Sequence, residues 1–192
     1  MAKVLFLHIP KTAGSSLRRA LTNNPDIEYH EWQQDHHSLS TLLTRCQYHN
    51  FTPDFSFTVV RNPYDRMESL FSYSRLLYKR EYSISNIAHQ KKFYKDFRLF
   101  TEYKFKPWLN WVLFERAKNS NNSVLKTQSS YVNCQYPLEV FKYEQLHILE
   151  SKLNIKMEVV NVQPKETVEW DNDCRDLVKL YYKEDFERFG YE

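Results

Sequence analysis

The sequence predicts an α/β fold, a single domain over residues 1–192 with a mostly parallel central sheet flanked by helices. Two apolar and β-branched runs, residues 4–9 and 55–60, have the length of buried strands. Each run leads through a short turn into a helical pattern, and this alternation is typical of a parallel sheet covered on both faces. The 192 residues are enough for one substantial core.

The turn after the first strand has the composition of an anion-binding loop. A proline ends the strand, Lys11 and small hydroxyl residues follow, and a helical pattern begins at Ser15 or Ser16. A helix that starts after a tight loop presents backbone N–H groups and a positive dipole end to a phosphate. Gly14 is one of two glycines in the chain, which indicates a close approach of the backbone to a ligand. The lysine does not have its Walker A position after the second glycine, and an ordinary strand-to-helix turn is the alternative.

The second strand is followed by a similar change from strand to helix. Asn62 is the predicted N-cap, and Pro63 suits the first turn of the helix. Arg61 stands at the carboxyl end of the strand, where open α/β sheets bind ligands, and Ser69 lies about two turns into the helix. The alternative is a surface ion pair of Arg61 or Arg66 with Asp65.

These two segments together resemble the cofactor-binding motifs of sulfotransferases that use 3′-phosphoadenosine 5′-phosphosulfate (PAPS). Residues 8–17, HIPKTAGSSL, resemble the 5′-phosphosulfate loop and look most like the branch of heparan sulfate 2-O-sulfotransferase and related carbohydrate enzymes. Residues 60–66, VRNPYDR, with a serine eight residues after the first arginine, resemble the segment that holds the 3′-phosphate. The order of elements in the C-terminal third is also similar to that of the family.

The resemblance implies a P-loop-like fold and a role for each matching residue. Lys11 would meet the bridging oxygen where negative charge grows as the S–O bond breaks, and Arg61 and Ser69 would hold the 3′-phosphate of PAPS and of its product PAP. The 5′-phosphate would lie against the backbone N–H groups and hydroxyls of Thr12, Ala13, Gly14, Ser15 and Ser16. The acceptor would be a hydroxyl, on a carbohydrate. This scheme needs no metal, and no metal-ligand spacing such as H-E-x-x-H or C-x-x-C occurs.

The reaction also needs a base for the proton of the acceptor. Histidine has an unperturbed pKa near 6.5, which suits this role at neutral pH. Related carbohydrate enzymes often place a histidine in the interval after the first helix, and the resemblance assigns the role to His37. His36 and a carboxylate stay open as alternatives, and both histidines could simply be neighbours of the next helix N-cap. His8 is expected to support the loop.

The rest of the chain is predicted as helices, one more strand and loops. A strand is expected at residues 140–143 and an extended segment at 159–162, with a polar loop at 119–123. Gly190 is interpreted as a stop after the last helix. The remaining helices are expected at residues 38–46, 145–153 and 173–186, the last with Leu177, Leu180 and Tyr181 inward.

Residues 79–106, dense in Lys, Tyr and Phe, are interpreted as a lid or acceptor-side insertion. The aromatic and apolar residues that follow them have helical spacing, and this stripe is more typical of a core than of a binding face. The stripe consists of Trp108, Trp111, Val112 and Leu113.

Composition excludes several other classes. The net charge of +3 is too small to indicate nucleic-acid binding, and no apolar stretch approaches the roughly 18 residues of a membrane span. Three widely spaced cysteines are typical of free thiols in a reducing compartment. No signal peptide precedes the first strand, so a cytoplasmic protein is expected, of unknown oligomeric state.

Two alternative functions stay open. One is a nucleotide kinase or NTPase, and the other is a non-catalytic module that binds a nucleotide or glycan.

Overall fold

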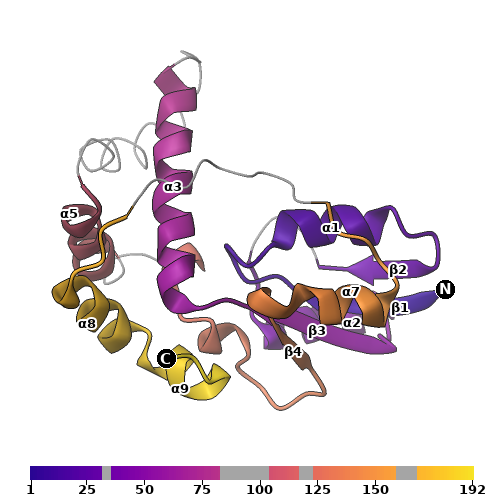
Figure 1. Ribbon diagram of the computed structural model, residues 1–192. Coiled ribbons are helices and arrows are strands. Elements are labelled where there is room, and N and C mark those ends of the chain that lie inside the picture. Colours follow the sequence, from indigo (N-terminus) through magenta and orange to yellow (C-terminus); the bar gives the residue numbers. More distant parts are fainter. Residues whose placement is uncertain (32–35, 83–103, 117–122, 159–167) are drawn as a thin grey trace. The chain divides into compact units, whose positions relative to one another are not determined.

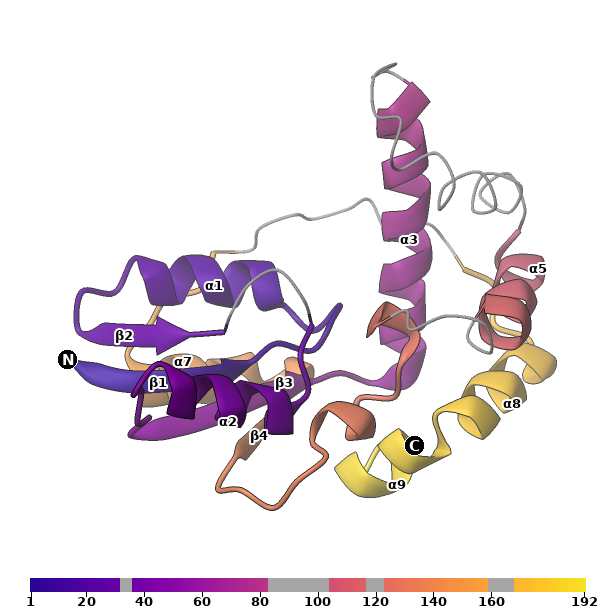
Figure 2. The same cartoon turned by 180° about the vertical axis from the view of Figure 1, so that it is seen from behind.

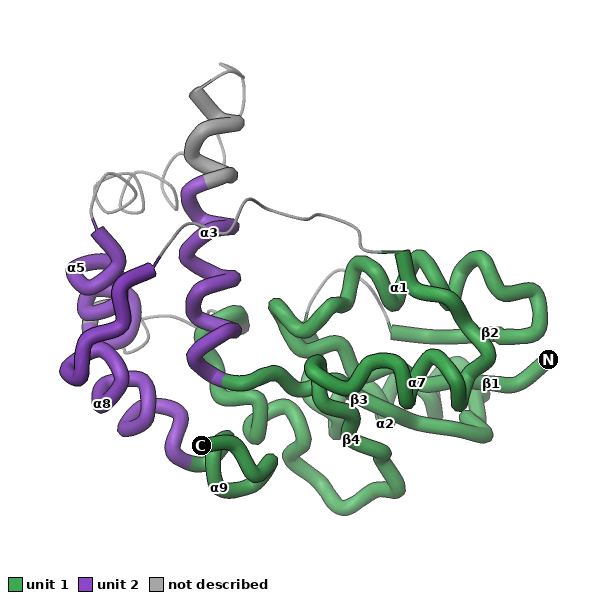
Figure 3. The backbone as a smooth tube through the Cα atoms, viewed as in Figure 1, with its two compact units in different colours: residues 1–62, 122–161, 184–192 green, residues 63–121, 162–183 purple. Residues whose placement is uncertain are grey.

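The computed structural model of the chain (Figure 1) describes residues 1–31, 36–82, 104–116, 123–158 and 168–192. Contacts divide the chain into two compact units, coloured separately in Figure 3. The first unit comprises residues 1–62, 122–161 and 184–192, and the second comprises residues 63–121 and 162–183. Each unit is described by itself below.

The first unit is built on a parallel sheet of four strands in the order β2-β1-β3-β4, which confirms the predicted α/β fold. The register aligns Val4 of β1 with Phe55 of β3. The sequence interpretation missed β2, because this edge strand has only four residues, pairs only with β1 and alternates with charged side chains. The strands are β1 (Ala2–Leu7), β2 (Ile27–His30), β3 (Phe55–Val60) and β4 (Glu139–Lys142).

Helices cover both faces of this sheet. Because side chains alternate along a strand, Leu5 and Leu7 pack with α2 (Leu39–Tyr48), whereas Val4 and Phe6 pack with α1 (Gly14–Thr22) and α7 (Leu146–Leu153). Figure 1 shows α7 across the near face, and Figure 2, seen from behind, shows α2 across the opposite one. The centre of the sheet is fully buried where the functional loops leave it, at Val4 to Leu7 of β1 and at Val59 and Val60 of β3.

The second unit is helical in its described part. It contains α3 (Pro63–Tyr82), α5 (Phe105–Asn110), the π-helical turn η1 (Trp111–Arg116) and α8 (Asn172–Tyr181). Phe71 packs edge-to-face against Phe105 and Trp108, with ring centroids 5.3 and 5.0 Å apart. Trp108, Val112 and Leu113 are buried, which confirms the predicted core position for three residues of the stripe, whereas Trp111 is half-buried. Most of the predicted lid, residues 83–103, and the extended segment at 159–162 lie outside the described residues.

The predicted helix over residues 173–186 is wrong in one respect, because the backbone forms two helices there. α8 ends at Tyr181, and α9 (Lys183–Phe189) follows after Tyr182, which has φ −107° and ψ 23°. Buried residues at 174, 178, 182 and 186 keep a spacing of four through the break, so the sequence pattern contains no sign of it. Leu180, expected inward, is 73% exposed.

Gly190 ends α9 as predicted. Its φ of +60° lies in the left-handed region, and the N–H of Tyr191 donates to the carbonyl of Phe186 at 3.0 Å. In the part of the chain that the structure describes, none of the helices is long and apolar enough to cross a lipid bilayer.

Candidate functional site

The two loops singled out in the sequence leave neighbouring strands at the same edge of the sheet. The chain passes from β1 to β2 on one side and then returns to β3 on the other side of β1. At such a switch point the loops after the two central strands diverge, and ligands of open α/β sheets bind there. The Nη1 atom of Arg61, just after β3, donates to the carbonyl oxygen of Lys11, just after β1, at 3.5 Å. The structure therefore joins the two predicted cofactor loops within the first unit.

The loop after β1 has an unusual backbone. Lys11 and Ala13 have φ values of 70° and 71°, a region that residues other than glycine seldom occupy. Thr12, between them, is fully buried and donates from its hydroxyl to the carbonyl of Ile9 at 2.8 Å. Thr12 thus holds the loop closed. Strain of this kind persists where the surrounding structure fixes the loop, as at ligand sites.

The loop ends at the N-terminus of α1. The N-cap residue is Ala13, which makes no side-chain hydrogen bond to the helix. The first backbone N–H groups of a helix have no carbonyl one turn earlier to receive them, so they suit an anion. Gly14, Ser15 and Ser16 form this first turn, and Ser15 is exposed whereas Ser16 is buried.

The His8 side chain requires a glycine at position 14, and the sequence interpretation did not predict this contact. A Cβ atom on Gly14 would lie 1.8 Å from Nε2 of His8. Gly14 is absent from the residues with positive φ, so backbone freedom is not the reason for this glycine. The close approach inferred from the sequence exists, but its partner in the structure is the imidazole of His8.

Gly14→Ala should therefore destabilise the first unit by about 1–3 kcal/mol, the usual cost of overpacking. The His8 ring cannot move aside freely, because it is stacked on Phe6 at 5.6 Å and meets His36 edge-on at 4.8 Å. Denaturant unfolding of the single and double variants measures the effect. His8→Ser combined with Gly14→Ala should cost less than the sum of the two changes, and simple additivity would contradict the predicted clash.

His8 is held as a neutral ring. Its burial, and then the charges of His36 and Arg18, lower its pKa to about 3. Arg18 donates from Nη2 to Nδ1 of His8 at 3.4 Å and forms an ion pair with the buried Glu31. Since arginine can only donate, the His8 proton is on Nε2, the atom beside Gly14. A ring with this pKa supports the loop, as expected, and is not a base at neutral pH.

The two candidate bases, His36 and His37, precede α2. His36 contacts His8, so the structure places it at the loop. His37 is half-buried and stands directly before Ser38, the N-cap of α2. The structure thus brings His36 to the first loop, and His37 is its neighbour in the sequence.

Two positive side chains meet at the site. Burial and the charge of Arg61 lower the pKa of Lys11 to about 8. Both influences disfavour the ammonium form of Lys11 in the free protein. A bound anion would act in the opposite sense, because it would stabilise the charge of Lys11 and of Arg61 together.

Arg61 is held by residues to which the sequence interpretation gave no role. Its guanidinium carbon lies 4.2 Å from the ring centre of Tyr143, and its backbone is bound by the side chain of Gln128. Arg61 is 8% exposed and Arg66 2%, so neither arginine is the surface side chain that the alternative assumed. Gln128 lies in a polar stretch without pattern, so no signal in the sequence pointed to it.

Ser69 belongs to the second unit, where it is half-buried on α3. Its predicted pairing with Arg61 on a 3′-phosphate spans the two units and stays a prediction. Among the described residues, no three His, Cys, Asp or Glu side chains gather as metal ligands.

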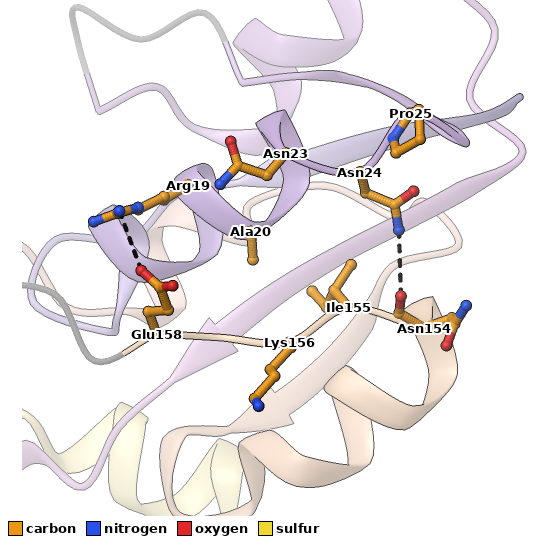
Figure 4. A pocket seen from close by; sticks show the side chains of 9 residues that line it. All are labelled: Arg19, Ala20, Asn23, Asn24, Pro25, Asn154, Ile155, Lys156 and Glu158. Atoms are coloured by element: carbon orange, nitrogen blue, oxygen red, sulfur yellow. Dashed lines mark hydrogen bonds and ion pairs between the residues drawn. The ribbon is translucent and has the colours of Figure 1, made fainter.

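A pocket of about 370 Å³ lies elsewhere in the first unit, at the C-terminal ends of α1 and α7 (Figure 4). Arg19 and Glu158 form an ion pair across it at 3.2 Å, and Asn24 donates to the carbonyl of Asn154 at 3.3 Å. Neither Lys11 nor Arg61 lines this pocket, so it is separate from the site at the switch point.

A family model described as "Sulfotransferase family" matches residues 2–164 of the chain. The match includes β1 to β4, both loops at the switch point and the histidine pair. No curated protein matches the sequence.

Proposed function

The chain belongs to the sulfotransferase family, and from this premise we propose that it moves a sulfuryl group from PAPS to an acceptor hydroxyl on a carbohydrate. PAPS supplies the activated sulfuryl group and leaves as PAP. The residues of the switch-point site supply binding, alignment and stabilisation of charge, which are the main contributions of a protein to transfers of this type.

The observation that carries the proposal is the meeting of Lys11 and Arg61. Two cations from neighbouring strand ends lie close enough that one lowers the pKa of the other, and both are largely withdrawn from water. Arg61 also has a buried Nε atom without a hydrogen-bond partner among the described residues. An anion with phosphate groups fits these features, since it would satisfy the free donor and balance the two charges.

Each residue of the loop has a proposed task. The backbone N–H groups of Thr12, Ala13, Gly14, Ser15 and Ser16 bind the 5′-phosphate at the N-terminus of α1. Lys11 holds a proton at the bridging oxygen, where negative charge grows on departure of the sulfuryl group. Arg61, with Ser69 of α3, binds the 3′-phosphate. His37 takes the proton of the acceptor hydroxyl.

Arg61→Ala should weaken PAP binding by about ten- to a hundredfold, the effect of removing hydrogen bonds from a charged donor. Binding of 5′-AMP, which lacks the 3′-phosphate, should change much less. Calorimetry with both nucleotides measures the two affinities. Arg19→Ala is a matched control, because it removes one positive charge at the other end of α1. Equal losses for PAP and 5′-AMP would remove Arg61 from the 3′-phosphate site.

The complete proposal is tested by incubating the protein with labelled PAPS and a panel of saccharides. We expect label on a saccharide hydroxyl and release of PAP in equal amounts. Transfer to lipids or other small alcohols alone would replace the carbohydrate acceptor and leave the PAPS donor in place. Binding of ATP as tight as that of PAP, without transfer to any acceptor, would contradict the PAPS assignment.

A further inference from the structure

Arg61 is held by three side chains of the first unit: Gln128 and Asp185, which are buried, and Tyr143, which is half-buried. The side-chain amide of Gln128 accepts from the Arg61 backbone N–H at 2.9 Å and donates to the Arg61 carbonyl at 2.8 Å. This pair of hydrogen bonds continues the pairing of β3 beyond its last residue, as a neighbouring strand would. Gln128 is itself fully buried, so these two hydrogen bonds to the backbone of Arg61 are shielded from water.

Gln128 is anchored in turn by α9. Asp185 is fully buried, and its two carboxylate oxygens accept from the backbone N–H groups of Gln128 and Ser129 at 2.8 and 2.7 Å. Arg188 adds a hydrogen bond to the carbonyl of Ser129 at 3.3 Å. These contacts connect the C-terminal helix to the end of β3 through one short segment.

Tyr143, directly after β4, fixes the other end of the arginine. Its ring lies face-on to the guanidinium, with 4.2 Å between Cζ and the ring centre. Arg61 is buried and the Tyr143 ring is half-buried, so the attraction lies between that of an exposed and that of a fully desolvated cation–π pair. The stack restricts the rotation of the guanidinium plane, and Nη1 points toward the Lys11 carbonyl while Nε stays without a partner among the described residues.

We propose that Tyr143 and Gln128 are positioning residues that orient Arg61 for the 3′-phosphate, and that the Tyr143 stack sets the preference of the site for a 3′-phosphorylated nucleotide. The inference rests on the proposed function. Gln128 fixes the backbone of the arginine, and Tyr143 fixes the plane of its donors. An arginine without this support would lose rotational freedom on binding, and a preorganised one binds at lower entropic cost.

The ratio of PAP to 5′-AMP affinity is the readout, because a merely structural defect lowers both affinities together. Tyr143→Leu should lower the ratio by about fivefold, the expected loss of a partly exposed cation–π contact. Tyr143→Phe retains the ring face and should keep the wild-type ratio. Tyr29→Leu is a matched control, since Tyr29 packs as a half-buried ring against the same core cluster and does not touch Arg61.

Calorimetry of the four proteins separates the possible failures. A wild-type ratio in Tyr143→Leu, or an equal loss in Tyr29→Leu, would overturn the role of Tyr143. A wild-type protein without preference for PAP over 5′-AMP would overturn the proposed function and this inference with it. If leucine at position 143 prevents folding, Tyr143→Met fills the same space and carries the same expectation.

Discussion

Lys11→Met should lower the turnover of sulfuryl transfer by about 10²–10³-fold, the usual cost of removing one donor from developing charge. Methionine keeps an unbranched side chain, so the cost of the positive φ at this position stays nearly the same. What is lost is the proton donor at the bridging oxygen. Single-turnover rates with bound PAPS measure this step apart from binding and product release. An unchanged single-turnover rate would show that the leaving oxygen is stabilised elsewhere.

The charge of Lys11 should also appear in the pH dependence of PAP binding. Burial and Arg61 hold the pKa of Lys11 near 8 in the free protein, and a bound phosphate would raise it. Lys11 is protonated below pH 8, so PAP affinity is highest there and falls as pH rises, approaching about tenfold per unit. The phosphates of PAP are fully ionised in this range and do not contribute. Lys11→Met should bind PAP more weakly and with little change between pH 7 and 9.

The sequence predicted the centre of the sheet well because buried parallel strands are continuous apolar runs. β1 and β3 have this form, and their loops carry the motifs that the structure joins at Lys11 and Arg61. The sequence interpretation missed β2 because Glu28 and His30 interrupt the apolar pattern of this short strand. The sequence interpretation missed the break between α8 and α9 at Tyr182, because the apolar spacing continues across it.

The supporting residues of the site could not be predicted from local patterns. Gln128 and Asp185 are 67 and 57 residues away from the groups that they bind, and each acts through hydrogen bonds to backbone. Backbone groups are the same at every position, so such contacts impose no motif on the sequence. The reason for the glycine at position 14 could not be predicted from the sequence either, because the contact that requires it comes from His8, six residues earlier.

The histidine pair gives the second large expected effect. His37→Ala should lower turnover by about 10²–10⁴-fold and leave PAP affinity nearly unchanged, because a general base acts on the acceptor and not on the nucleotide. His36→Ala should weaken PAP binding and leave turnover nearly unchanged. Its ring packs edge-on against His8, which in turn lies against Gly14, so its loss should loosen the phosphate loop and weaken PAP binding.

Comparison of turnover and PAP affinity in the two variants assigns the base. His147→Ala serves as a control, since His147 is exposed on α7, away from both loops. If His36→Ala loses turnover with intact PAP affinity, the base is His36 and His37 is only a neighbour of the Ser38 cap. If neither variant loses turnover, a carboxylate takes the proton. The separation is possible because the His36 ring contacts His8, so that the loss of this ring acts on the phosphate loop itself.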